Sequence, residues 1–116
     1  MMKSLLISYV LIGLAFAVVL PVSGQDLIEN PELDKRVKTF LESRRGQWYD
    51  MNVPAVDGKL LYDIIIENGY KDALEIGTST GYSTIWIAWA LSKTGGRLIT
   101  IEIDERRYKK AVANFR

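Results

Sequence analysis

The sequence contains no cysteine and no histidine, and it has no marked excess of charge of either sign. The lack of cysteine excludes a disulfide framework, a thiolate zinc site and a cysteine nucleophile. The lack of histidine excludes imidazole metal sites and histidine acid–base catalysis. With 15 basic and 14 acidic side chains among 116 residues, the chain lacks the strongly positive field of a nucleic-acid-binding protein. Any chemistry must therefore rely on carboxylates, hydroxyls, amines or backbone groups.

Residues 1–24 have the composition of a leader segment. Lys3 precedes an apolar run over residues 5–20, and Pro21 is followed by small residues. These features are typical of a secretory signal peptide, cleaved here before Gln25. At ~1.5 Å per residue, the segment of residues 5–22 is also just long enough to cross a bilayer core of roughly 30 Å. We expect either a cleaved signal, which would make the protein secreted or periplasmic, or a membrane anchor. Membrane contact is expected only if the segment stays uncleaved.

Residues 25–116 predict two helices followed by alternating strands and helices. Asn30 before Pro31 is typical of a helix start, because Asn caps free amides and Pro suits the first helical position. The first predicted helix starts at Pro31 and is ended by residues 44–46, and a loop follows over 47–56. Asp57 opens a second helix, in which Leu60, Leu61, Ile64 and Ile65 point inward. After it we expect a strand over 73–76, a turn over 77–81, a helix over 82–91, a strand over 98–103 and a last helix capped by Asp104.

The alternation of strands and helices indicates an α/β fold with a parallel sheet. The predicted strands are apolar enough to be buried, as strands of parallel sheets are on both faces. Such sheets need several strands, so two strands do not complete a domain. We therefore interpret residues 25–116 as the N-terminal part of a larger enzyme.

Residues 74–83 pass from a strand through a glycine turn into a helix. Gly77 and Gly81 allow a ligand to approach the backbone without a Cβ in the way. Amide donors at the helix start, with Ser83 beside them, suit a ligand carboxylate or phosphate. Glu102 ends the next strand, 21 residues after Gly81, where a carboxylate can accept hydrogen bonds from both hydroxyls of an adenosine ribose. Together these features predict a site for an adenosine-containing ligand.

Two classes of adenosine ligand fit this pattern unequally. A dinucleotide site favours Gly-x-Gly-x-x-Gly, whose second glycine makes room for a pyrophosphate, and Ser79 occupies that position here. A phosphate-binding P-loop would need Gly-Lys-Ser/Thr, which the sequence lacks. Glu75, just before the first glycine, suits a ligand with an amino group and a cationic sulfur. The pattern favours S-adenosylmethionine and leaves a nicotinamide-dependent oxidoreductase as the alternative.

At these residues the chain resembles the class I S-adenosylmethionine-dependent methyltransferases, and most closely the catechol and caffeoyl-CoA O-methyltransferase family. The resemblance covers residues 30–116 and is strongest at residues 75–83 and at Glu102. It implies a Rossmann-like methyltransferase fold and methyl transfer to a hydroxyl of a small-molecule acceptor. A non-catalytic, exported relic of this fold is a further alternative, because S-adenosylmethionine is made in the cytosol.

The resemblance also implies roles for Glu102 and for several residues of the glycine motif. Glu102 would hold the ribose hydroxyls, and Gly77 and Gly81 would shape the turn beneath the methionine half of the cofactor. Ser83 would bind the methionine carboxylate, and Glu75 would help to place the amino group.

Three residues of the apolar loop before the second helix complete the expected site. Met51 and Val53 would line the pocket near the sulfonium, while Asn52 would hold the shape of the loop. The expected cofactor-binding residues are thus Met51, Val53, Glu75, Gly77, Gly81, Tyr82, Ser83 and Glu102. Relatives bind a divalent cation through later carboxylates and an amide, so we expect catalytic and metal-binding residues only beyond Arg116. The oligomeric state is left open.

Overall fold

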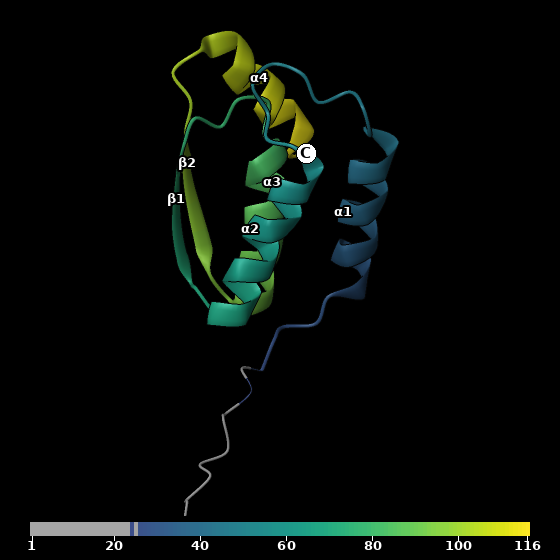
Figure 1. Cartoon of the computed structure of the whole chain (residues 1–116), viewed down its shortest axis with the longest axis vertical. Helices are drawn as coiled ribbons and strands as arrows, with labels where there is room; N and C mark the ends of the chain where they lie inside the picture. The colour runs from purple at the N-terminus through teal and green to yellow at the C-terminus, as the bar shows by residue number, and fades with distance from the viewer. Residues whose placement is uncertain (1–23, 25) are drawn as a thin grey trace, which may run out of the picture.

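The computed structural model describes Gly24 and residues 26–116, so the expected leader lies outside the described residues except for Gly24. The described elements follow the predicted order (Figure 1). They are α1 (Pro31–Ser43), α2 (Ala55–Asn68), β1 (Asp72–Ile76), α3 (Tyr82–Thr94), β2 (Arg97–Ile101) and α4 (Glu105–Asn114). Among the described residues, no helix combines the length and the apolar character needed to cross a membrane.

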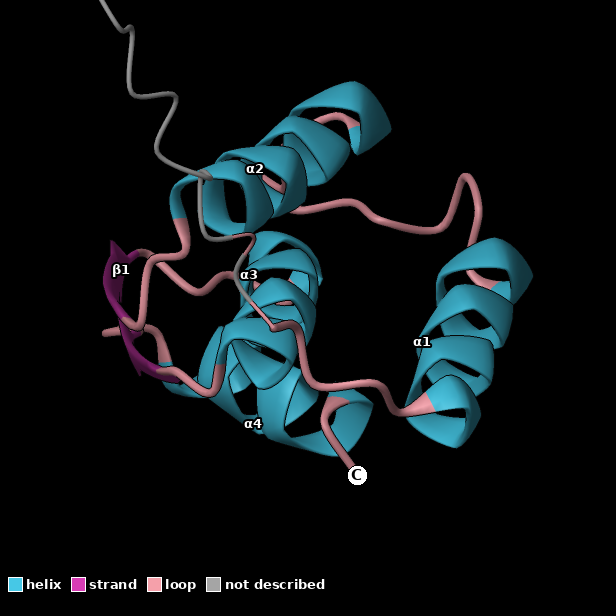
Figure 2. Ribbon diagram, turned by 90° about the horizontal axis from the view of Figure 1, so that it is seen from below, coloured by secondary structure: helices cyan, strands magenta, loops and turns pink. Residues whose placement is uncertain are grey.

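The two strands pair in parallel, as predicted, with Asp72 opposite Arg97 and Ile76 opposite Ile101. All four helices lie on one side of this sheet (Figures 1 and 2). Because successive side chains of a strand point to opposite faces, the helices cover only every second residue. On the open face Ile76 is 80% exposed, and Leu74, Ile99 and Ile101 are also exposed. Among the described residues, the strands are therefore half-buried on the face that the helices cover and exposed on the other face.

The core lies between α2, α3 and the inner face of the sheet. Its buried members are Ile65, Ile87, Ala90 and Leu91, surrounded by the partly buried Leu61, Tyr62, Ile66, Ala73 and Leu98. Leu61 and Ile65 of α2 face this core as predicted, whereas Leu60 and Ile64 are exposed. The reason is that α2 turns one narrow stripe inward, and a residue one position earlier lies about 100° around the helix.

The first helix docks on the rest of the fold through a partly buried ion pair. α1 begins where predicted, since Asn30 caps a backbone amide of its first turn and Pro31 is its first residue. The Asp34 carboxylate accepts hydrogen bonds from Lys93 Nζ (2.6 Å) and Trp89 Nε1 (2.7 Å), both in α3. These two bonds, the one from Lys93 above all, hold the pKa of Asp34 below its ordinary value. No residue of α1 is fully buried, and its apolar residues Leu33, Val37, Phe40 and Leu41 are half-buried.

Two predicted helix boundaries differ from those in the structure. α2 begins at Ala55 rather than near Asp57, because Pro54 already has the extended backbone that precedes a helix. α3 continues beyond its predicted end to Thr94 and stops where Gly95 takes a left-handed conformation. Both helices are therefore longer than the apolar spacing alone indicates.

Candidate functional site

The glycine turn and the segment after β2 meet at the carboxyl ends of the two strands, as the sequence predicts. β2 ends at Ile101, so Glu102 lies just after the strand and not at its last position. The Ile101 carbonyl accepts hydrogen bonds from the amides of Gly77 (2.8 Å) and Thr78 (3.2 Å). These bonds fix the start of the turn against the end of β2. The turn and Glu102 are therefore parts of one corner of the molecule.

Both carboxylate oxygens of Glu102 organise this corner. Oε2 accepts a hydrogen bond from the Ser79 amide at 2.7 Å, and Oε1 accepts one from the Asp104 amide at 2.9 Å. The bond from Asp104, followed by the bond from Ser79, holds the pKa of Glu102 below its ordinary value. An ionised carboxylate has about four acceptor positions, so about two remain for a ligand. Glu102 is thus a fixed, charged acceptor at the strand ends.

Gly77 and Gly81 both have positive φ, of +94° and +98°, a region that favours glycine. Their surroundings differ. Among the described residues, no atom beyond Gly77 and its two chain neighbours lies within 4 Å of the position that a Cβ would take there, whereas a Cβ at Gly81 would lie 2.5 Å from Phe115 Cε1. Gly77 therefore leaves space in which a ligand can reach the backbone. At Gly81 the corresponding space is filled by an aromatic ring just after α4.

Glu75 and Ser83 are hydrogen-bonded to each other. Glu75 Oε1 accepts from Ser83 Oγ at 2.5 Å, while Oε2 accepts from Thr100 Oγ1 at 2.7 Å and from Thr84 Oγ1. The carboxylate thereby joins β1 to β2 and to the first turn of α3. Because a hydroxyl has a single proton, Ser83 can donate to a ligand only if its proton turns away from Glu75.

The loop between α1 and α2 is fastened to the glycine turn by side-chain hydrogen bonds. Asn52 Nδ2 donates to Thr80 Oγ1 at 2.8 Å, and Asn52 Oδ1 accepts from the Tyr82 amide at 3.4 Å. Ser79 Oγ donates to the carbonyl of Asp50. The expected role of Asn52, which was to hold the shape of the loop, is confirmed.

Asp50 was not singled out from the sequence, yet it joins the same loop to α4. Its Oδ1 accepts from Arg107 Nη2 (2.8 Å) and Nε (3.1 Å), and its Oδ2 accepts from Arg106 Nη2 (2.7 Å). These bonds lower the pKa of Asp50 and raise that of Arg107. Asp50 and Arg107 are 57 positions apart, so no local spacing brings them together. One signal for this contact is present in the sequence, because Arg106 and Arg107 lie in the first turn of a helix. The helix dipole disfavours cations at that end, so an acidic partner for them is expected.

The remaining candidates differ in exposure. Met51 has a φ of +65° and is 84% exposed, and Val53 is half-buried. Met51 therefore lies beside the turn without being enclosed by the other described residues. Tyr82 is buried, with its ring 4.8 Å from that of Trp48. Its side chain packs in the interior, and only its backbone amide faces the loop residue Asn52.

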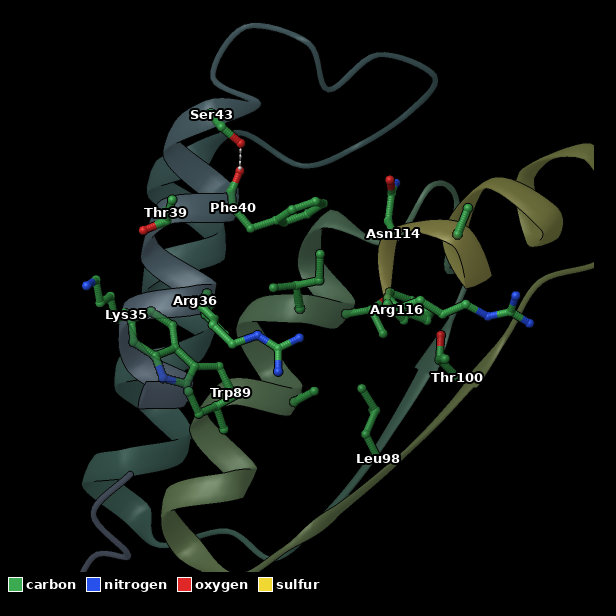
Figure 3. Close-up of a pocket in the computed structure, with 17 residues that line it drawn as sticks. Lys35, Arg36, Thr39, Phe40, Ser43, Trp89, Leu98, Thr100, Asn114 and Arg116 are labelled. Carbon is green, nitrogen blue, oxygen red and sulfur yellow. Dashed lines mark hydrogen bonds between the residues drawn. The ribbon is translucent and has the colours of Figure 1, made fainter. Parts of the chain in front are cut away.

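Two cavities open elsewhere on the described part of the chain. One, of about 1080 Å³, lies between α1, α3, β2 and the end of α4; Arg36 and Phe40 of α1 face it from one side and Thr100 of β2 from another (Figure 3). The second, of about 820 Å³, is lined by α1, α2 and the Trp86 side of α3. The glycine turn and Glu102 line neither cavity. At the predicted corner Thr78, Ser79 and Thr80 of the turn are buried, and Glu102 is half-buried.

Comparison with known proteins identifies similar sequences. A family model described as O-methyltransferase matches residues 24–115. A catechol O-methyltransferase of Niastella koreensis is 54% identical over 45 residues, which are 39% of this chain and 20% of the relative. A putative caffeoyl-CoA O-methyltransferase of Arabidopsis thaliana is 33% identical over 78 residues, which are 67% of this chain and 33% of the relative. The chain thus spans a fifth to a third of the length of these curated relatives.

A solved structure shows the same arrangement of elements. The O-methyltransferase TomG from Streptomyces achromogenes, crystallised in complex with S-adenosylmethionine, is 34% identical and superposes with a TM-score of 0.53. The match covers 77% of this chain and 38% of that protein. The predicted fold class, an α/β fold of the Rossmann-like methyltransferase type, is confirmed by this likeness.

Proposed function

This chain belongs to the O-methyltransferase family, and from that premise we propose that residues 25–116 form the cofactor-binding part of an S-adenosylmethionine-dependent O-methyltransferase. The methyl group would be transferred to a hydroxyl of a small-molecule acceptor. The observation that carries the proposal is the position of Glu102 beside the glycine turn, at the carboxyl ends of two adjacent parallel strands.

Glu102 would accept hydrogen bonds from the two hydroxyls of the cofactor's ribose. The amides of Ser79 and Asp104 hold its carboxylate in place and leave about two of its acceptor positions for a ligand. Hydrogen bonds to an ionised acceptor are about twice as strong as those between neutral groups. This fit supports an adenosine ligand at the end of β2.

The glycine turn would lie beneath the methionine half of the cofactor. Gly77 offers open space beside its Cα, and Gly81 supplies the left-handed backbone from which α3 starts. Ser83 would bind the methionine carboxylate once its proton turns away from Glu75. Glu75 would then help to place the amino group, and the Tyr82 amide lies at the same helix start.

The loop before α2 would cover the reactive end of the cofactor. Met51 and Val53 would line the space near the sulfonium, where the exposed Met51 side chain has apolar surface to offer. S-adenosylmethionine supplies an electrophilic methyl group bonded to a cationic sulfur. The protein's part is to align the acceptor oxygen with that methyl group and to exclude water from it.

The acceptor half of the site is proposed to come from residues beyond Arg116. These would include the catalytic residues and the ligands of a divalent cation that orients the acceptor hydroxyl. Within the part of the chain that the structure describes, no group of three or more acidic side chains could hold a metal ion. The proposal for this chain is therefore limited to binding of the cofactor.

For residues 1–24 we propose a cleaved signal peptide, with a membrane anchor as the alternative outcome. The apolar run over residues 5–20 and the small residues after Pro21 support cleavage. Sequencing the N-terminus of protein isolated from cells would test this. A start at Gln25 would support export, and a start at Met1 would favour an anchor.

Calorimetric titration with S-adenosylmethionine and, in parallel, with NAD tests the proposed function. We expect binding of S-adenosylmethionine at one site and no binding of NAD. Binding of NAD alone would favour the nicotinamide-dependent oxidoreductase. If a protein that unfolds cooperatively binds neither, a non-catalytic relic of the fold would be favoured.

A further inference from the structure

We propose that Asp50, clasped by Arg107 and Arg106 of α4, is the residue that positions the loop of residues 47–54 over the cofactor corner. Asp50 is a positioning residue, since it acts through the loop and through Glu102, and Arg107 is its principal partner. This inference rests on the proposed function for its ligand, S-adenosylmethionine.

Five residues form a closed ring of hydrogen bonds around the corner. The Asp50 carbonyl accepts from Ser79 Oγ, and the Ser79 amide donates to Glu102 Oε2 at 2.7 Å. Glu102 Oε1 accepts from the Asp104 amide at 2.9 Å, and Asp104 Oδ1 accepts from the Arg107 amide at 2.8 Å. The Arg107 guanidinium closes the ring on the Asp50 carboxylate at 2.8 Å. A displacement of Asp50 is therefore transmitted to Glu102 both through Ser79 and through Arg107 and Asp104.

Burial distinguishes the two arginines of the clasp. The side chains of Asp50 and Arg107 are 22% and 28% exposed, whereas that of Arg106 is 68% exposed. Arg107 also makes two hydrogen bonds to Oδ1, and Arg106 makes one to Oδ2. An ion pair that is shielded from water is screened less by solvent and salt. Arg107 should therefore contribute more than Arg106 to holding the loop.

The backbone of the loop needs such a restraint. Asp50 and Met51 have φ values of +75° and +65°, in the left-handed region that disfavours residues with a Cβ. Two consecutive residues persist there only when their surroundings hold them. The Asp50 clasp and the Asn52 bonds to the glycine turn are those surroundings. The direction in which Met51 points beside the turn thus depends on Asp50.

The test compares Asp50→Ala, Arg107→Ala and the double variant with the parent by titration with S-adenosylmethionine. Lys109→Ala is the matched control, because it removes one cation from the same helix and breaks only the exposed pair with Glu105. We expect each single clasp variant to weaken binding about tenfold, since a hydrogen-bonded charge pair is lost. The double variant should bind no more weakly than the poorer single variant. The control should stay within about twofold of the parent.

Hydrogen exchange of the ligand-free proteins supplies a second readout that needs no cofactor. The amides of Ser79 and Tyr82, which donate to Glu102 and to the loop residue Asn52, should exchange at least about tenfold faster in Asp50→Ala than in the parent, while those in the interior of α2 should be unchanged. Arg107→Lys, which keeps the charge, should restore part of both the affinity and the protection.

The results of these experiments test the role of the Asp50 clasp and the proposed function separately. Equal affinity, or equal exchange of the Ser79 and Tyr82 amides, in Asp50→Ala and the parent would overturn the positioning role. Failure of the parent to bind S-adenosylmethionine would overturn the proposed function and the link between the clasp and this cofactor. Exchange of these two amides would in that case still decide whether Asp50 holds the loop.

Discussion

Replacement of Gly81 by alanine should destabilise the protein more than the same replacement at Gly77. Both residues have φ near the upper end of the left-handed region, at +98° and +94°, where a Cβ costs about 1–3 kcal/mol. At Gly81 the new Cβ would also lie 2.5 Å from Cε1 and 2.8 Å from Cζ of Phe115, so the ring must move. Phe115 is 45% exposed, so its displacement forfeits about half of the burial energy of a phenylalanine, or about 1 kcal/mol. The expected costs are roughly 2–4 kcal/mol at Gly81 and about 1–3 kcal/mol at Gly77.

Urea denaturation followed by tryptophan fluorescence would give the free energies of unfolding. The restriction that alanine imposes on the unfolded chain is the same at Gly77 and Gly81, so it cancels in the comparison. In a Phe115→Ala background, Gly81→Ala should cost only the backbone contribution, which gives a coupling free energy of about 1 kcal/mol in a double-mutant cycle. A Gly81→Ala cost no larger than that of Gly77→Ala, or one unchanged by removal of the ring, would refute the described packing of Phe115 on the turn.

Two further predictions concern the fold. Leu91→Ala should cost about 2–5 kcal/mol in the same denaturation assay, because Leu91 is fully buried in the core; a cost under about 1 kcal/mol would contradict this placement. Lys93 and Trp89 lower the pKa of Asp34 in the folded protein. The stability that the Asp34 carboxylate contributes is therefore fully present above the unfolded aspartate pKa of about 3.9, and it is lost as the pH falls through the lower folded-state pKa. Urea midpoints measured from about pH 6 to pH 3 should therefore fall less steeply for Asp34→Asn than for the parent, and parallel curves would rule the ion pair out as the cause.

Local signals in the sequence were sufficient to predict the order of the elements and the meeting of the glycine turn with Glu102 at the strand ends. Asn30 and Pro31 act through hydrogen bonds and dihedral angles within one helix turn, so a pattern of adjacent residues reveals them. The same is true of the glycine turn between β1 and α3. Glu102 was found through its distance in sequence from Gly81, because a parallel strand–helix–strand unit brings those two positions to the same edge.

Features that depend on distant partners were not predictable in this way. The described helices all lie on one face of the sheet, which alternation of elements does not specify (Figure 2). Asp50 is charged and stands in a loop, so nothing near it in sequence distinguishes it from a solvated residue until α4 supplies its arginines. Met51 combines a left-handed backbone with an exposed side chain, and neither feature is specified by its neighbours in sequence.

The assignment of Glu102 to the ribose is the centre of the account, and equilibrium dialysis with radiolabelled S-adenosylmethionine tests it most directly. Glu102→Ala should weaken binding by about 30-fold or more, because two charge-assisted hydrogen bonds are lost. Glu105→Ala removes a neighbouring exposed carboxylate and should bind as the parent does. If Glu102→Ala binds S-adenosylmethionine as tightly as the parent and the control, Glu102 does not hold the ribose and the proposed cofactor site is wrong.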